Sequence, residues 1–129
     1  MGLQVIDLTG IDSGVVSLVN VVEGTDTGKT HNVAINEESG YLYRTGGSYH
    51  GLRIYSLANP AAPAYVGSWD SRYVHDAQIV TWSDGRELAF CCSGFNGGWD
   101  DTGLTIVDVT DKQNITVVAQ LYYLSLIHI

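Results

Sequence analysis

Basic residues are scarce in this chain, and the shortage excludes several kinds of partner. The 129 residues include 6 Lys and Arg against 14 Asp and Glu, which gives a formal net charge of −8. Because nucleic-acid backbones and anionic lipid surfaces attract positive charge, this balance argues against nucleic-acid binding and against adsorption to an anionic membrane. No apolar run reaches the roughly 18 residues of a membrane-spanning helix. The first ten residues, MGLQVIDLTG, also lack the basic start and apolar core of a signal peptide.

Cysteine is equally scarce, since Cys91 and Cys92 are adjacent and are the only two. Neighbouring residues of a strand point to opposite faces, so an ordinary disulfide between them would be strained. We therefore predict two free thiols, at least one of them buried. A vicinal disulfide and a metal-ligand role remain open alternatives.

Helical periodicity is missing throughout, and the chain instead repeats itself. Three segments align on a glycine: GLQVIDLTGID from Gly2, GLRIYSLANPA from Gly51 and GLTIVDVTDKQ from Gly103. Two longer segments, HNVAINEESGYLYRTGG and HDAQIVTWSDGRELAFCCSG, precede the second and third copies. Each core run ends in a polar residue whose side chain we expect to bond to the following backbone in a turn: Asp7, Ser56 and Asp108.

The middle copy reads as four short strands, which we place at Asn32–Asn36, Tyr41–Thr45, Leu52–Leu57 and Tyr65–Trp69. Gly40 supplies the positive φ of the first hairpin turn. The equivalent runs of the three copies are nearly continuously apolar, as LQVIDL and LTIVDV show, and this suits strands packed on both faces. Four antiparallel strands per repeat are typical of a β-propeller blade.

The predicted fold is all-β, a β-propeller fragment of about two and a half four-stranded antiparallel blades. Residues 2–22 would form the last two strands of a truncated blade, residues 28–69 a complete blade and residues 73–123 a second one. A closed ring needs about four to eight blades, so we expect the chain to be a fragment. The last six residues, LSLIHI at 124–129, match one reading frame of a transposase end used in sequencing libraries. We expect them to be adapter read-through, so His128 is not counted as a ligand.

The motifs GLQVIDLTG, HNVAINEESGYLY, HDAQIV and LTIVDVTDKQN resemble those of LVIVD-repeat β-propellers, specifically the choice-of-anchor B family of bacterial surface proteins. The resemblance covers roughly residues 2–123. It implies a propeller that is secreted or held at the cell surface by a variable C-terminal anchor, with no established activity. The chain departs from the pattern in CCSGFNGGWDDTG, where a loop is longer and richer in glycine, and after Tyr123.

Candidate site residues lie at the starts of the innermost strands. Alternating strand direction places the longer, more varied loops on one face, where binding residues usually lie. His31, Asn32, His75 and Asp76 would open two inner strands beside the central channel. These four residues would bind a ligand, with His31 and His75 as ligands of a divalent metal. The alternative for the two histidines is that they lock neighbouring blades through ring-to-backbone hydrogen bonds. The same face or its edge would carry His50, Asp26, Asp70, Asp100 and Asp101.

Recognised catalytic motifs are missing: the chain contains no G-x-S-x-G, H-E-x-x-H, P-loop or G-x-G-x-x-G sequence. Our leading hypothesis is a non-catalytic binding or scaffolding module of a secreted or cell-surface propeller. Its partners would be an unknown extracellular ligand or protein and the remaining blades of the same chain. The alternative is a metal-dependent enzyme with its site at the channel mouth. Because the fragment would leave inter-blade faces and strand edges unpaired, we also expect it to self-associate.

Overall fold

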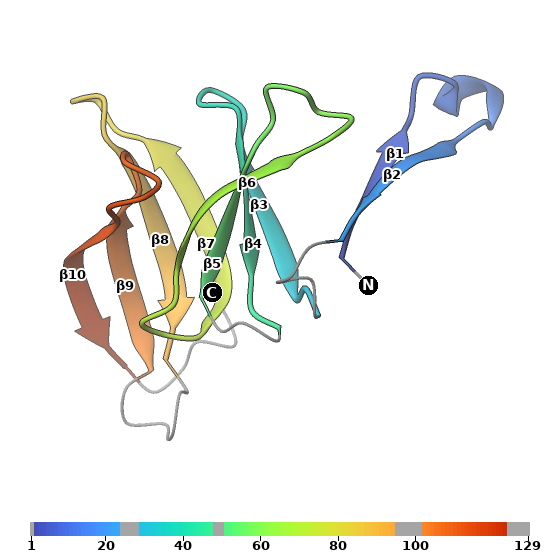
Figure 1. Cartoon of the computed structure of the whole chain (residues 1–129). Helices are drawn as coiled ribbons and strands as arrows, with labels where there is room; N and C mark the ends of the chain where they lie inside the picture. The colour runs from blue at the N-terminus through green and yellow to red at the C-terminus, as the bar shows by residue number, and fades with distance from the viewer. Residues whose placement is uncertain (1, 24–28, 48–50, 95–101, 124–129) are drawn as a thin grey trace.

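The computed structural model describes residues 2–23, 29–47, 51–94 and 102–123, and within these ranges the chain is all-β with no α-helix (Figure 1). Several residues discussed above lie outside the described part: Asp26, His50, Asp100, Asp101 and residues 124–129. No helix in the described part is long and apolar enough to span a membrane.

The strands form three antiparallel sheets in which sheet order follows chain order (Figure 1). An N-terminal hairpin stands apart from two four-stranded sheets, which we call the middle sheet and the C-terminal sheet. The hairpin contains β1 (Leu3–Asp7) and β2 (Ser17–Val22). The middle sheet contains β3 (Asn32–Asn36), β4 (Tyr41–Thr45), β5 (Leu52–Ser56) and β6 (Ala64–Trp69). The C-terminal sheet contains β7 (Val74–Thr81), β8 (Glu87–Ser93), β9 (Gly103–Asp108) and β10 (Thr116–Tyr122).

The strand predictions for the middle sheet are largely confirmed. β3 and β4 have the predicted bounds, β5 ends at Ser56 rather than Leu57, and β6 begins at Ala64 rather than Tyr65. A short 3-10 helix, η1 (Ile11–Ser13), connects β1 to β2 and was not predicted. It closes on Gly14, whose φ of 73° lies in the left-handed region that glycine adopts easily.

The predicted turn chemistry is also confirmed. Gly40 has a φ of 73°, and its N–H donates to the carbonyl of Asn36 at 2.9 Å. The polar residue that ends each central strand accepts a hydrogen bond from the backbone N–H two residues later. These pairs are Asp7 with Thr9 at 2.8 Å, Ser56 with Ala58 at 3.3 Å and Asp108 with Thr110 at 3.0 Å.

The core lies between the middle and C-terminal sheets. Tyr43, Leu52 and Ile54 of the middle sheet form one cluster with buried apolar residues of the C-terminal sheet, including Ala89 and Val107. Cys91 is buried in this cluster whereas Cys92 is half-buried, and both are free thiols as predicted. Burial raises the pKa of the Cys91 thiol well above its ordinary value, so this group is a packing residue.

The glycine on which the repeats align has a packing reason. A Cβ on Gly51 would lie 1.6 Å from the carbonyl oxygen of Trp69, and one on Gly103 would lie 2.0 Å from that of Leu121. In both sheets the start of the central strand therefore approaches the backbone of the outer strand closer than any side chain permits.

The expectation that central strands are buried on both faces is correct for β5 and wrong for β1. All but the last residue of β5 are buried, whereas only Leu3 of β1 is. The physical reason is that β5 has a strand on each side and another sheet against it, while β1 pairs with β2 alone among the described strands. Apolar side chains of the hairpin consequently remain exposed, with Ile6 at 50% and Leu18 at 59%.

Candidate functional site

The structure brings the two predicted histidines together where the middle and C-terminal sheets meet. His31 directly precedes β3, His75 lies in β7, and these two strands are in contact. The imidazole rings are tilted by 55° with their centroids 4.2 Å apart. His75 is the extra residue of a β-bulge between Val74 and Asp76. A bulge re-aims a side chain, which explains how His75 reaches His31 while its neighbours stay in the ladder.

Asn32 and Asp76 join the two sheets directly beside the rings. The Asn32 Nδ2 group donates to Asp76 Oδ1 at 2.9 Å. Each residue also accepts from the N–H that follows it, Val33 for Asn32 and Ala77 for Asp76, both at 2.8 Å. The four residues selected from the sequence thus lie at one junction. Asn32 and Asp76, which are equivalent in the two repeats, each accept a hydrogen bond from the N–H that follows and meet each other across the sheets.

The locking function expected of the imidazoles is carried by other groups. The Thr45 hydroxyl donates to the His75 carbonyl oxygen at 3.1 Å, which joins β4 to β7 across the sheets. Among the described residues, the interaction found for each imidazole is with the other imidazole. Both histidines are exposed. Asn32, Asp76 and Thr45 therefore hold the sheets together, and the two rings face solvent.

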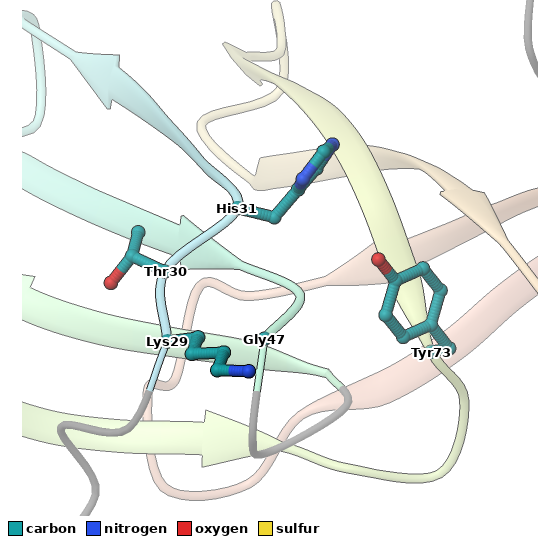
Figure 2. Close-up of a pocket in the computed structure, with 5 residues that line it drawn as sticks. All are labelled: Lys29, Thr30, His31, Gly47 and Tyr73. Carbon is teal, nitrogen blue, oxygen red and sulfur yellow. The ribbon is translucent and has the colours of Figure 1, made fainter.

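An open pocket of about 510 Å³ adjoins His31 (Figure 2). Its lining residues are Lys29, Thr30, His31, Gly47 and Tyr73. In Figure 2 the Tyr73 hydroxyl points toward the side on which His31 lies. Gly47 has a φ of 87°, and a Cβ there would lie 1.4 Å from the Lys29 carbonyl oxygen. Only glycine lets the two segments pass so closely. The ammonium, imidazole and phenol groups make the pocket rich in hydrogen-bond donors, which suits a ligand with acceptor oxygens.

A metal site at this junction has few ligands. Within the described ranges, no group of three His, Cys, Asp or Glu residues could hold a metal ion. Cys92 lies opposite Asp76 in the register of β7 and β8. Burial, and then the charge of Asp76, raise the pKa of the Cys92 thiol, so it remains protonated at neutral pH.

Asp70, which was placed on the same face from the sequence, is engaged elsewhere. It forms an ion pair with Arg53, and the Ser68 hydroxyl donates to it at 3.3 Å. The Arg53 side chain is buried in the middle sheet. A buried charge needs a partner, so Asp70 has a structural role as the counterion of Arg53.

The sequence reasoning missed a buried polar cluster at the opposite end of the same two sheets. Glu87, at the start of β8, accepts hydrogen bonds from Asn36 at the end of β3 at 2.9 Å and from Ser39 in the β3–β4 turn at 2.7 Å. Its other oxygen lies 2.5 Å from the Lys112 ammonium. Lys112 also donates to the Val109 carbonyl oxygen at 2.8 Å. An acid next to the apolar run LAF was the available signal, because a charge in a buried strand requires compensation.

The environment of this cluster shifts the pKa values of Glu87 and of the neighbouring Tyr43 in opposite directions. Burial raises the pKa of Glu87, but hydrogen bonds from Lys112, Ser39 and Asn36 outweigh burial and place it below its ordinary value. Burial, and then the nearby charge of Glu87, raise the pKa of Tyr43 far above its ordinary value. The cluster therefore holds an ionised carboxylate and a neutral phenol between the sheets.

No family model, curated protein or solved structure matches this chain.

Proposed function

We propose that the chain is a non-catalytic binding or scaffolding module whose ligand site is the junction of the middle and C-terminal sheets. The observation that carries the proposal is the meeting of two equivalent repeat residues, His31 and His75. Their exposed rings have centroids 4.2 Å apart, and His31 lines the pocket. Asn32 and Asp76 fix the strands that carry the rings. A site held rigid in this way needs little ordering when it binds.

The proposal extends to a β-propeller architecture. Its support is the repeat itself, namely two four-stranded antiparallel sheets in contact and a hairpin whose strand β1 aligns in sequence with β5 and β9. The resemblance to the choice-of-anchor B family supports secretion or display at a bacterial cell surface. In this architecture the units would be blades, and the starts of β3 and β7 would lie along the channel.

The ligand that best fits is a small molecule with several acceptor oxygens. Lys29, His31 and Tyr73 line the pocket, and side chains of these types donate hydrogen bonds to acceptor oxygens. The metal-dependent enzyme has less support, because two imidazoles alone make an incomplete catalytic metal site.

Imidazole NMR tests this proposal. Long-range 1H–15N spectra would be recorded with a panel of small carboxylates, phosphates and polyols, and separately with Zn²⁺. We expect members of the panel to shift the ring signals of His31 and His75 together. The variant His31→Gln should lose the response. The variant Arg86→Gln is the matched control and should keep it, because Arg86 lies in the β7–β8 turn at the other end of the sheets.

Two outcomes would overturn the proposal, and a third would favour its alternative. A panel that leaves both ring signals unchanged removes the ligand site, and hits that survive His31→Gln place binding elsewhere. Stoichiometric Zn²⁺ binding that His31→Gln abolishes would restore the metal alternative.

A further inference from the structure

We infer that the free edge of β1 is a docking site for a β-hairpin built like β3–β4. The inference concerns a surface other than the His31–His75 junction and does not depend on the ligand proposed there. It begins with three equivalent strands: β1 reads LQVID, β5 reads LRIYS, and β9 reads LTIVD after its initial glycine.

In both four-stranded sheets the strand with this sequence is an interior strand. β5 lies between β4 and β6, and β9 lies between β8 and β10. β1 pairs with β2, the equivalent of β6 and β10, and within the described residues it has no strand on its other side. An unpaired strand edge presents backbone N–H and C=O groups that can accept a further strand.

Burial at the equivalent positions shows what β1 lacks. Ile6, Tyr55 and Val107 occupy the same place in the three strands. Tyr55 is 4% exposed and Val107 is fully buried, whereas Ile6 is 50% exposed. A two-stranded hairpin is at best marginally stable in water, and added strands bury more of its apolar face. β1 therefore has the sequence of an interior strand but the exposure of an edge strand.

The occupant is defined by what fills this edge in the other two units. There it is an antiparallel hairpin, β3–β4 in one sheet and β7–β8 in the other. In the middle sheet Thr45 lies opposite Leu52 and Tyr43 lies opposite Ile54. The same register would place the threonine opposite Leu3 and the tyrosine opposite Val5. The partner is thus a short hairpin of alternating apolar residues with a tight glycine turn.

A peptide of residues 31–45, HNVAINEESGYLYRT, serves as the probe. Fluorescence anisotropy of labelled peptide would be measured against the 129-residue chain, at concentrations that sedimentation shows to be monomeric. We expect saturable binding and slower amide exchange in residues 3–7. The variant Val5→Lys should weaken binding by about tenfold or more, because it sets a charge against the peptide's apolar side chains.

Two controls keep the result decisive. Val117→Lys makes the same change on β10, an edge strand of the C-terminal sheet, and should alter the affinity by less than about twofold. A peptide with Tyr43→Pro should not bind, because proline removes a ladder hydrogen bond. This second control retains its value even if Val5→Lys unfolds the hairpin.

The inference is overturned if binding does not saturate or if the proline peptide binds equally well. It also fails if new protection appears in β10 instead of β1, if the two lysine variants weaken binding equally, or if a second copy already protects β1 before peptide is added.

Discussion

Glu87 connects the two large sheets at the end opposite the His31–His75 junction. Its side chain is 6% exposed and accepts hydrogen bonds from Asn36 in β3, from Ser39 in the β3–β4 turn and from Lys112 in the β9–β10 loop. A buried ion pair adds little net stability compared with an apolar pair, but losing one partner leaves an uncompensated charge. The cluster therefore favours one alignment of the two sheets. Removing one member should lower the free energy of unfolding, because the remaining charge stays buried without a partner.

Replacing the cation of this pair should be strongly destabilising. We expect Lys112→Met to lower the free energy of unfolding by about 3–5 kcal/mol, since Glu87 stays buried without its counterion. Urea denaturation at neutral pH measures the loss. Asp84→Asn is the matched control: it breaks the exposed pair with Arg86 and should cost about 1 kcal/mol or less.

The double variant Lys112→Met/Glu87→Gln separates charge from packing. It should recover part of the stability that Lys112→Met loses, because the amide needs no counterion. A double variant that is no more stable than Lys112→Met would contradict the charge explanation.

Stability should fall in acid through the same carboxylate. The folded pKa of Glu87 lies below its ordinary value of 4.5, so the folded state releases this proton more readily than the unfolded state. Its contribution is fully present above about pH 4.5 and is lost as the pH falls through the folded pKa. Unfolding free energies measured from pH 7 to pH 3 should fall less steeply below pH 4.5 in Glu87→Gln than in the wild type. Equal slopes would show that other acids dominate.

At the scale of the element, the glycine that begins β9 controls how closely β9 and β10 approach. A Cβ at Gly103 would lie 2.0 Å from the backbone oxygen of Leu121. A backbone atom cannot rotate away from this contact as the end of a side chain can. We expect Gly103→Ala to reduce stability by about 1–3 kcal/mol. Urea denaturation measures the change. Faster hydrogen exchange of the β10 amides would show that β10 is the strand that frays.

Gly40 provides the comparison, because it has a φ of 73° but open space around its Cβ position. Gly40→Ala should cost about 1–2 kcal/mol from backbone strain alone. Gly40→Asn should recover much of this loss, since asparagine tolerates the left-handed region. Gly103→Asn should recover none. Recovery at both positions would contradict the steric explanation for Gly103.

At the scale of the whole molecule, charge and exposed apolar surface act in opposite directions. The net charge of −8 keeps copies apart, while β10 is exposed along its whole length and Leu121 is 62% exposed. Exposed apolar strands at a sheet edge favour association. The predicted self-association should therefore depend on how far salt screens the charge.

Sedimentation velocity in low and high salt tests this balance. We expect the weight-average sedimentation coefficient to rise between about 20 mM and about 500 mM NaCl, as the screening length shortens. Leu121→Lys should suppress the rise. Gln120→Lys adds the same charge to the neighbouring exposed position and should suppress it less. A monomer at every salt concentration would refute the prediction.

Local structure follows from the amino-acid sequence alone. Strand positions such as Asn32–Asn36, the left-handed turn at Gly40 and the side-chain turns at Asp7, Ser56 and Asp108 all follow from short-range chemistry. Such features depend on residues within a few positions of one another, so one copy of the pattern suffices. Repetition then placed His31 and His75 at equivalent positions, and the structure brings them together.

Which polar groups join the sheets, and which strands are buried, depends on contacts between residues far apart in the chain. Asn32, Thr45 and Asp76 make the contacts first assigned to the imidazoles, because the bulge at His75 turns its ring outward from the ladder. Glu87 finds its donors at Asn36, Ser39 and Lys112, residues far from it in the chain. β1 and β5 share a motif but differ in burial. The burial of a strand depends on its neighbouring strands, which the sequence of the strand itself does not specify.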